Sequence, residues 1–217
     1  MSRCFLCRHH AEPAPSANMH PLRTLCVFCS SSDAVAPEYF AVATELGAAL
    51  AARKITLVYG GGQVGLMGAV ARAVHQHGGR VHGVIPGYLR TRELAYEASD
   101  ELLVTPDLRA RKAAMEERAD AFVALPGGFG TLEEILEVLT LKQLGRHHKP
   151  IAFLNTNGFF DPLLAQFERL FAGQFTKPDY RAYYHVASTV PDLFERLDAG
   201  DPAPVVAKWF AAPPGTR

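Results

Sequence analysis

A glycine-rich segment at residues 126–134 carries the residue types best suited to binding an anion and reacting beside it. It reads Pro-Gly-Gly-Phe-Gly-Thr-Leu-Glu-Glu and separates an apolar run from a helical pattern. Glycines at the start of a helix leave backbone N–H groups accessible, and the helix dipole adds about half a positive charge there. Thr131 can add a hydroxyl donor. The segment therefore has the features of a phosphate site.

The two carboxylates that end this segment allow two interpretations. Glu133 can complement the helix dipole, and Thr131-x-x-Glu134 fits a capping box that would serve only the helix end. Helix statistics alone favour the capping box. In the catalytic interpretation, one carboxylate lies beside the ribose carbon of a bound nucleotide. There it would stabilise an oxocarbenium-like transition state or orient the attacking water, as carboxylates do in glycoside hydrolysis.

Two basic residues and one further acid are candidates for ligand contacts. Arg111 and Lys112 lie on the helical pattern that precedes the glycine segment. They could form a solvated basic face together with Arg109, or a fork for phosphate and ribose oxygens, which suits the geometry of arginine. Glu93 lies in a long loop after a strand end, where ligand contacts and ordinary exposed acids are both common.

A second glycine cluster, Gly60-Gly61-Gly62-Gln63-Val64-Gly65, satisfies the pattern G-x-G-x-x-G between a strand and a helix. A dinucleotide site would also need an acid about 20 residues later, and residues 79–85 contain none. No glycine is followed by Lys-Ser or Lys-Thr, which excludes a P-loop. Three consecutive glycines exceed the need of a tight turn and favour close approach of the backbone to a ligand.

The elements that must position these residues alternate between strands and helices. Apolar runs predict strands at 25–29, 55–59, 81–85, 101–104, 121–125 and 150–154, with a short one near 184–187. Helical patterns cover 37–52, 65–77, 131–144 and 160–171, and another helix is expected from Thr105 as its cap with Pro106 first. This order predicts an α/β fold: a doubly wound parallel sheet in three layers, α/β/α. Such sheets bind ligands at the carboxyl ends of strands, where the strand order reverses.

Composition narrows the class of protein. The 217 residues contain 22 Lys+Arg and 22 Asp+Glu, a balance that argues against a nucleic-acid binder or an anionic-membrane binder. The apolar runs are too short to span a bilayer, and charged residues interrupt the N-terminus, so we expect a cytoplasmic protein. Residues 1–22 contain three prolines without an apolar period and are expected to be a disordered extension before a single domain at 23–217.

The cysteines resemble a zinc ribbon at first sight, because Cys4-x-x-Cys7 and Cys26-x-x-Cys29 form two spaced pairs. The second pair lies in the apolar run 25–29. In a strand, Cys26 and Cys29 would point to opposite faces and could not share one metal ion. We therefore expect no metal site.

These motifs together resemble the LONELY GUY (LOG) family of cytokinin riboside 5′-monophosphate phosphoribohydrolases, older members of which were called lysine decarboxylase-like. The resemblance covers about residues 24–187. Its most specific element is P-G-G-x-G-T-x-x-E at 126–134, with its partner Arg-Lys at 111–112. Further matches are Val-Tyr-Gly-Gly-Gly at 58–62, Gly-Leu-Met-Gly at 65–68, Gly-Val-Ile-Pro at 83–86 and Gln-Leu-Gly at 143–145. Where the family often has Cys-Gly-Ser-Ser and Met-His-Glu, this chain has Cys-Ser-Ser-Ser at 29–32 and Leu-Arg-Ala at 108–110.

The resemblance implies a Rossmann-like fold, a homodimer or larger homo-oligomer, and no metal or organic cofactor. The implied reaction is hydrolysis of the N-glycosidic bond of an adenine-type nucleoside 5′-monophosphate, which releases the free base and ribose 5-phosphate. Arg111 and Glu134 fall on the family's catalytic positions. The expected substrate contacts are Glu93, Lys112, Gly127, Gly128, Phe129, Gly130, Thr131, Leu132, Glu133 and Thr140, together with Gly60, Gly61, Gly62 and Met67 from the second glycine cluster.

Two other functions fit the same loops. A non-catalytic carrier or sensor could bind a nucleotide or a phosphate-bearing cofactor, with Arg111 and Glu134 only structural. A decarboxylase would need a lysine that forms a Schiff base with pyridoxal phosphate, and Lys112 is the lysine nearest the expected site. The sequence does not distinguish a prenylated adenosine monophosphate from AMP as substrate.

Overall fold

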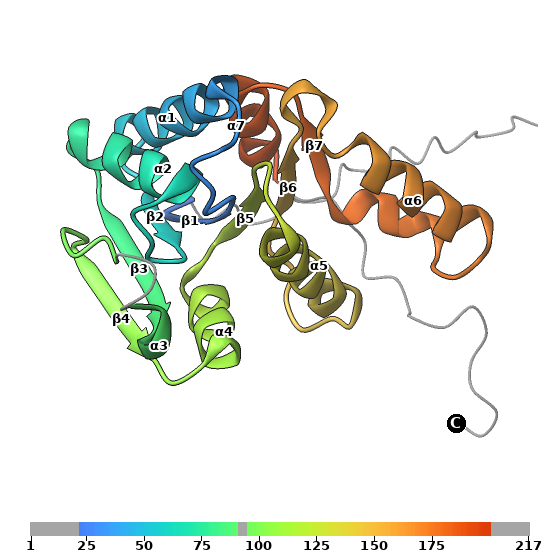
Figure 1. Ribbon diagram of the computed structural model, residues 1–217. Coiled ribbons are helices and arrows are strands. Elements are labelled where there is room, and N and C mark those ends of the chain that lie inside the picture. The colour runs from blue at the N-terminus through green and yellow to red at the C-terminus, as the bar shows by residue number, and fades with distance from the viewer. Residues whose placement is uncertain (1–21, 91–94, 201–217) are drawn as a thin grey trace, which may run out of the picture.

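A parallel sheet forms the centre of the computed structural model, which describes residues 22–90 and 95–200 (Figure 1). Its strands follow the order β4-β3-β2-β1-β5-β6-β7, and every neighbouring pair is parallel. The strands are β1 (Thr24–Phe28), β2 (Thr56–Tyr59), β3 (Val81–Pro86), β4 (Glu101–Thr105), β5 (Ala121–Ala124), β6 (Ile151–Leu154) and β7 (His185–Ala187). They agree with the strands predicted from the apolar runs to within one residue or so at most ends.

Helices cover both faces of the sheet and give the predicted three layers. One face packs against α1 (Pro37–Ala52), α2 (Gly65–Gln76) and α7 (Val190–Asp198). The other packs against α4 (Leu108–Arg118), α5 (Phe129–Gln143), α6 (Asp161–Ala172) and the 3₁₀ segment η2 (Pro178–Tyr183). The short helices α3 (Gly87–Arg90) and η1 (Thr156–Gly158) lie in connections. The doubly wound α/β fold is thereby confirmed.

The direction of winding changes between β1 and β5. From β1 the chain builds β2, β3 and β4 outward to one edge, and it then returns to build β5, β6 and β7 toward the other. The loops after β1 and β5 therefore diverge to opposite faces and leave a crevice between them, which is where ligands bind in such sheets. The glycine segment at 126–134 follows β5 at this point.

Two local predictions were wrong or incomplete. Helix α4 begins at Leu108, and its cap is Asp107, whose carboxylate accepts a hydrogen bond from the Ala110 N–H at 2.8 Å. Thr105 instead ends β4, and its hydroxyl donates to the Asp107 carbonyl at 3.1 Å. The expected loop after β3 contains the helix α3 and, at Ala95, an antiparallel bridge to Gly62.

Within the described ranges, no helix is both long and apolar enough to cross a membrane. The predicted disordered extension, which includes Cys4 and Cys7, lies outside the residues that the structure describes, apart from Leu22.

Candidate active site

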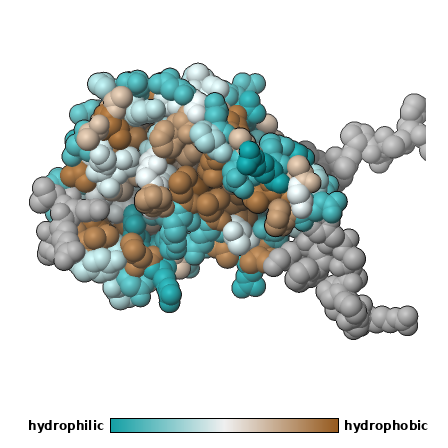
Figure 2. Space-filling model, turned by 45° about the vertical axis from the view of Figure 1, so that its right-hand side comes forward, coloured by the Kyte–Doolittle hydropathy of each residue, from teal (hydrophilic) through white to brown (hydrophobic). Residues whose placement is uncertain are grey.

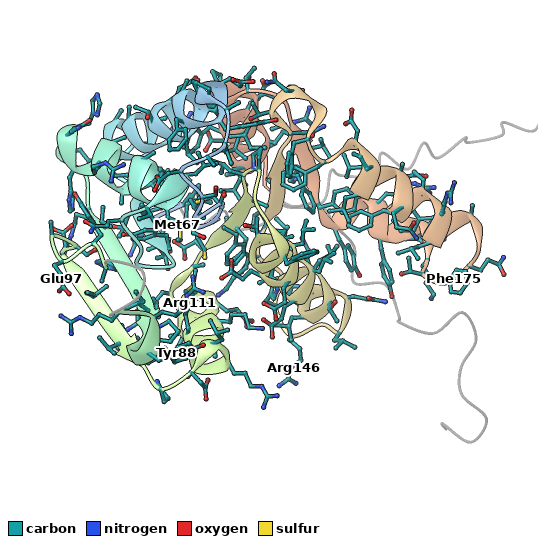
Figure 3. The ribbon with its side chains drawn as sticks, in the orientation of Figure 1. Met67, Tyr88, Glu97, Arg111, Arg146 and Phe175 are labelled. Atoms are coloured by element: carbon teal, nitrogen blue, oxygen red, sulfur yellow. The ribbon has the colours of Figure 1, made fainter. Side chains whose placement is uncertain are left out.

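A pocket of about 320 Å³ opens at the reversal of strand order. Its floor is formed by the ends of β1 and β2, and its walls by α4 and the start of α5. The lining is Val27, Phe28, Cys29, Ser30, Ser31, Ser32, Gly60, Met67, Leu89, Arg111, Gly128, Phe129, Gly130, Thr131 and Glu134. In Figure 3 Met67 and Arg111 lie near each other at the centre of the view, far from Phe175. Residues from distant parts of the chain thus converge at one site.

Arg111 and Glu134 form a buried ion pair on one wall of this pocket. The Arg111 Nη1 lies 3.2 Å from Glu134 Oε1, and the two side chains are only 12% and 9% exposed. The Arg111 Nε also donates to the Val84 carbonyl at the end of β3, at 3.1 Å. These contacts hold the guanidinium in a fixed orientation, with part of its edge toward the pocket.

Gly60 leaves the space that this guanidinium fills. A Cβ at position 60 would lie 2.0 Å from Arg111 Nη2 and 3.0 Å from Met67 Sδ, both closer than real contacts allow. The glycine is therefore explained by close approach of a side chain of this protein. The sequence had indicated close approach of a ligand at the same place.

Burial raises the pKa of Glu134 from 4.5 to about 6. The positive charge of Arg111 opposes this effect, and the neighbouring Glu133 adds to it. At neutral pH the carboxylate is therefore mostly ionised but poorly solvated. A negative charge in such surroundings is well suited to stabilise a cation that develops beside it.

The capping box that helix statistics favoured does not form. Helix α5 starts at Phe129 with Gly128 as its cap, two residues earlier than predicted, so Thr131 is already within the first turn. Thr131 is buried, and its Oγ1 would lie 2.1 Å from a Cβ at Gly127. Because the cap lies at Gly128, the Glu134 side chain is not used at the helix end and faces Arg111 instead.

Lys112 points away from the pocket, toward two acids of α5. Its Nζ contacts Glu133 Oε1 and lies 2.8 Å from Glu137 Oε2. Burial lowers the pKa of Lys112, but hydrogen bonds to the two carboxylates outweigh this and raise it above 10.5. The pair Arg111-Lys112 therefore links α4 to α5 through two neighbouring acids, and only Arg111 lines the pocket.

The other predicted contacts divide into two groups. Gly60, Met67, Gly128, Phe129, Gly130 and Thr131 line the pocket, and Gly127 adjoins it through Thr131. The lining does not include Gly61, Gly62, Leu132, Glu133 or Thr140. Thr140 lies six residues beyond Glu134 on α5, which turns it by about 240° to another side of the helix. Glu93 lies outside the described residues.

The loop after β1 was missing from the predicted site. Ser30, Ser31 and Ser32 line the pocket, and the Ser30 carbonyl accepts hydrogen bonds from Leu66 N and Met67 N at 2.9 and 3.3 Å. The Ser30 N–H donates to the Pro126 carbonyl at 3.2 Å. The loop thus ties the start of α2 to the glycine segment. The available signal was its place after the first strand of a doubly wound sheet.

The two described cysteines lie on opposite sides of the sheet, as predicted, with Cys26 in one core layer and Cys29 in the other. Both thiols are free and buried, and burial raises the pKa of each. Among the residues at 22–90 and 95–200, no group of three or more His, Cys, Asp or Glu side chains is arranged to hold a metal ion.

Comparison with known proteins identifies the family. A family model described as "Possible lysine decarboxylase" matches residues 67–197. The probable cytokinin riboside 5′-monophosphate phosphoribohydrolase LOGL2 of Oryza sativa subsp. japonica is 47% identical over 180 residues, 83% of this chain and 74% of that protein. The cytokinin riboside 5′-monophosphate phosphoribohydrolase LOG7 of Arabidopsis thaliana is 45% identical over 180 residues, 83% of each chain. The chain belongs to the LOG family.

Solved structures extend the likeness of this LOG family member to more distant proteins. The Moco carrier protein of Chlamydomonas reinhardtii has a TM-score of 0.63 at 25% identity, over 82% of this chain and 96% of that one. The molybdenum cofactor binding protein of Rippkaea orientalis has a TM-score of 0.63 at 24% identity, over the same shares, and shows likeness of fold alone.

The decarboxylase label of the family model finds no support in the described pocket of this LOG protein. A Schiff base would need a lysine there, and the lining residues of the described chain include none. Lys112 pairs with acids, and Lys142 is buried on the far side of α5, where its Nζ donates to the Tyr183 carbonyl at 3.1 Å.

Proposed function

We propose that this protein hydrolyses the N-glycosidic bond of adenosine 5′-monophosphates, with or without an N6 substituent, and releases the free base and ribose 5-phosphate. The observation that carries the proposal is the buried Arg111–Glu134 pair, held beside the start of α5 in one pocket. The names of relatives at 45–47% identity support the same reaction.

The 5′-phosphate would bind at the start of α5. The first N–H groups of a helix have no partner within the helix, and here they belong to the segment Gly128–Thr131, which lines the pocket. Phe129 and Gly130 are exposed, so the backbone at this point is open to a ligand. The hydroxyl groups of the serine loop after β1 face the same space and can donate further hydrogen bonds.

Arg111 and Glu134 would act on the ribose. As the bond between C1′ and the base nitrogen breaks, its electron pair leaves with the base and C1′ becomes cationic. The Glu134 carboxylate stabilises this cation and guides water to C1′, and it can accept the proton that the water releases. Arg111 positions the ribose phosphate and balances the charge of the carboxylate.

We also propose that the active protein is a homodimer whose second copy covers an apolar groove beside α5. The groove has a volume of about 280 Å³ and lies between α5, α6 and η2, with Thr140 in its lining. Leu136 and Phe175 at this groove are 36% and 82% exposed. Figure 2 shows apolar residues gathered across the face that its view brings forward.

Thr140 is the residue that favours a second copy as the occupant. It is an expected substrate contact, yet it lies outside the pocket of its own chain, so it could reach substrate only across a subunit boundary. Leu136→Asp should convert a dimer into a monomer in sedimentation velocity and raise KM. A wild-type monomer with full activity would contradict the dimer.

The Moco carrier protein supports a carrier as the second candidate function, because it shares the fold and 25% identity. The test is a panel of nucleoside 5′-monophosphates, AMP and isopentenyladenosine monophosphate included, incubated with wild type and Glu134→Gln. We expect free base and ribose 5-phosphate from wild type only, as measured by chromatography. Intact nucleotides that bind without turnover would instead support the carrier.

A further inference from the structure

The segment at residues 95–100 is hydrogen-bonded along the glycine turn that ends β2. The Tyr96 N–H donates to the Gly61 carbonyl at 2.9 Å, and Ala95 pairs with Gly62 in an isolated antiparallel bridge. Within the segment, the Ser99 N–H and hydroxyl donate to the Tyr96 carbonyl at 3.0 and 2.7 Å. The segment is therefore internally closed and joined directly to the backbone of Gly61 and Gly62.

A chain of three polar side chains fixes this segment to α2 and β3. His75 of α2 lies between the other two, with Nδ1 3.0 Å from the Tyr96 hydroxyl and Nε2 3.0 Å from Asp100 Oδ2. The same Asp100 oxygen accepts a hydrogen bond from the Val81 N–H at 2.7 Å. Burial opposes ionisation of Asp100, yet the hydrogen bonds from Val81 and His75 hold its pKa below 3.8.

The arrangement selects one tautomer of neutral His75. An ionised carboxylate can only accept, so Nε2 carries the hydrogen toward Asp100. Nδ1 is then an acceptor, and the Tyr96 hydroxyl donates to it. Each side chain thus has a defined role, as in the second shell of side chains that orients catalytic groups in other enzymes.

The glycine turn carries this order to the candidate site. Gly61 has a φ of 77°, and a Cβ there would lie 3.1 Å from Ile85 Cβ, so the turn packs closely against β3. The preceding residue, Gly60, lines the pocket and contacts the Arg111 guanidinium. A shift of the turn toward the pocket would therefore displace Arg111 from Glu134.

We propose that His75 and Tyr96 are positioning residues for the hydrolysis: they hold the 95–100 segment, which holds the Gly60–Gly62 turn against which Arg111 rests. This inference rests on the proposed function. It assigns to a side-chain cluster outside the pocket an effect on the geometry of the Arg111–Glu134 pair.

The test uses Tyr96→Phe, which removes one hydroxyl and keeps the ring. Loss of one hydrogen bond should lower kcat about 2- to 10-fold. His75→Gln, whose amide can reach Asp100 but not Tyr96, should give a similar loss, and the double variant should be no worse than either single one. The control is Glu97→Gln in the same segment, because Glu97 pairs with Arg90 at 2.9 and 2.8 Å at the exposed margin marked in Figure 3. Its kcat should equal that of wild type.

A second measurement separates this proposal from the hydrolase proposal. AMP affinity is measured by calorimetry in the Glu134→Gln background, where no turnover is expected. Adding Tyr96→Phe should weaken AMP binding at least 2-fold. A wild type that releases no base would refute the hydrolysis, while this binding result would still test the positioning. If Tyr96→Phe lowers only the melting temperature and leaves kcat, KM and AMP affinity unchanged, the cluster is merely structural and the inference is wrong.

Discussion

Replacing Glu134 by Gln is expected to improve stability while it removes activity. The carboxylate is 8% exposed, and its pKa is raised from 4.5 to about 6. The folded protein therefore binds this proton more tightly than the unfolded chain does. The stability contributed by the group is fully present below pH 4.5 and is lost as pH rises through 6.

The size of the effect follows from the difference between the two pKa values. A separation of about 1.5 pH units corresponds to about 2 kcal/mol at 1.36 kcal/mol per unit. This value already includes the attraction to Arg111, so it applies to loss of the charge in place. Glu134→Gln, which resembles the protonated acid, should thus be about 2 kcal/mol more stable than wild type at pH 7.5. The difference should vanish near pH 4.5.

The assay combines chemical denaturation at pH 7.5 and 4.5 with base release from AMP. We expect turnover of Glu134→Gln to fall by about 10²- to 10⁴-fold, the usual range for loss of an acid–base group. Glu117→Gln, at an exposed position of α4, is the control and should change stability by less than about 0.5 kcal/mol. A Glu134→Gln protein that is less stable than wild type at pH 7.5 would refute the reasoning about burial. Wild-type turnover in this variant would refute the catalytic role.

Three further predictions concern the same features. The kcat/KM of wild type should fall below about pH 6, because the ionised form of Glu134 is the active one and its pKa is raised to about 6; a profile that is flat down to pH 5 would contradict this. Gly60→Ala should lower turnover at least about 10-fold while melting stays cooperative, since the new Cβ displaces the flexible end of Arg111; crystallography of the variant would show whether the guanidinium has moved. His147 is buried, and burial lowers its pKa from 6.5 to about 4. The unfolded chain therefore binds this proton more readily, and wild type should lose about 2 kcal/mol relative to His147→Gln between pH 7.5 and 4.5, as measured by urea unfolding.

The sequence by itself determined the fold class and the location of the site. Apolar runs that alternate with helical patterns are local signals, and they predicted the strands and most helix bounds because both faces of a parallel sheet are buried. The glycine segment could be recognised as an anion site because its chemistry lies in consecutive backbone groups. The pairing of Cys26 and Cys29 with opposite core layers followed from strand geometry alone.

Only the tertiary structure decided what individual side chains do. The helix statistics of Thr131 and Glu134 describe an isolated helix end, whereas the packing of α4 beside α5 brings Arg111 to Glu134 and leaves Lys112 to two other acids. The serine loop after β1 joined the site because the reversal between β1 and β5 places it there. Such contacts join residues that are distant in the chain, so their partners depend on how the layers pack, and no local pattern contains that information.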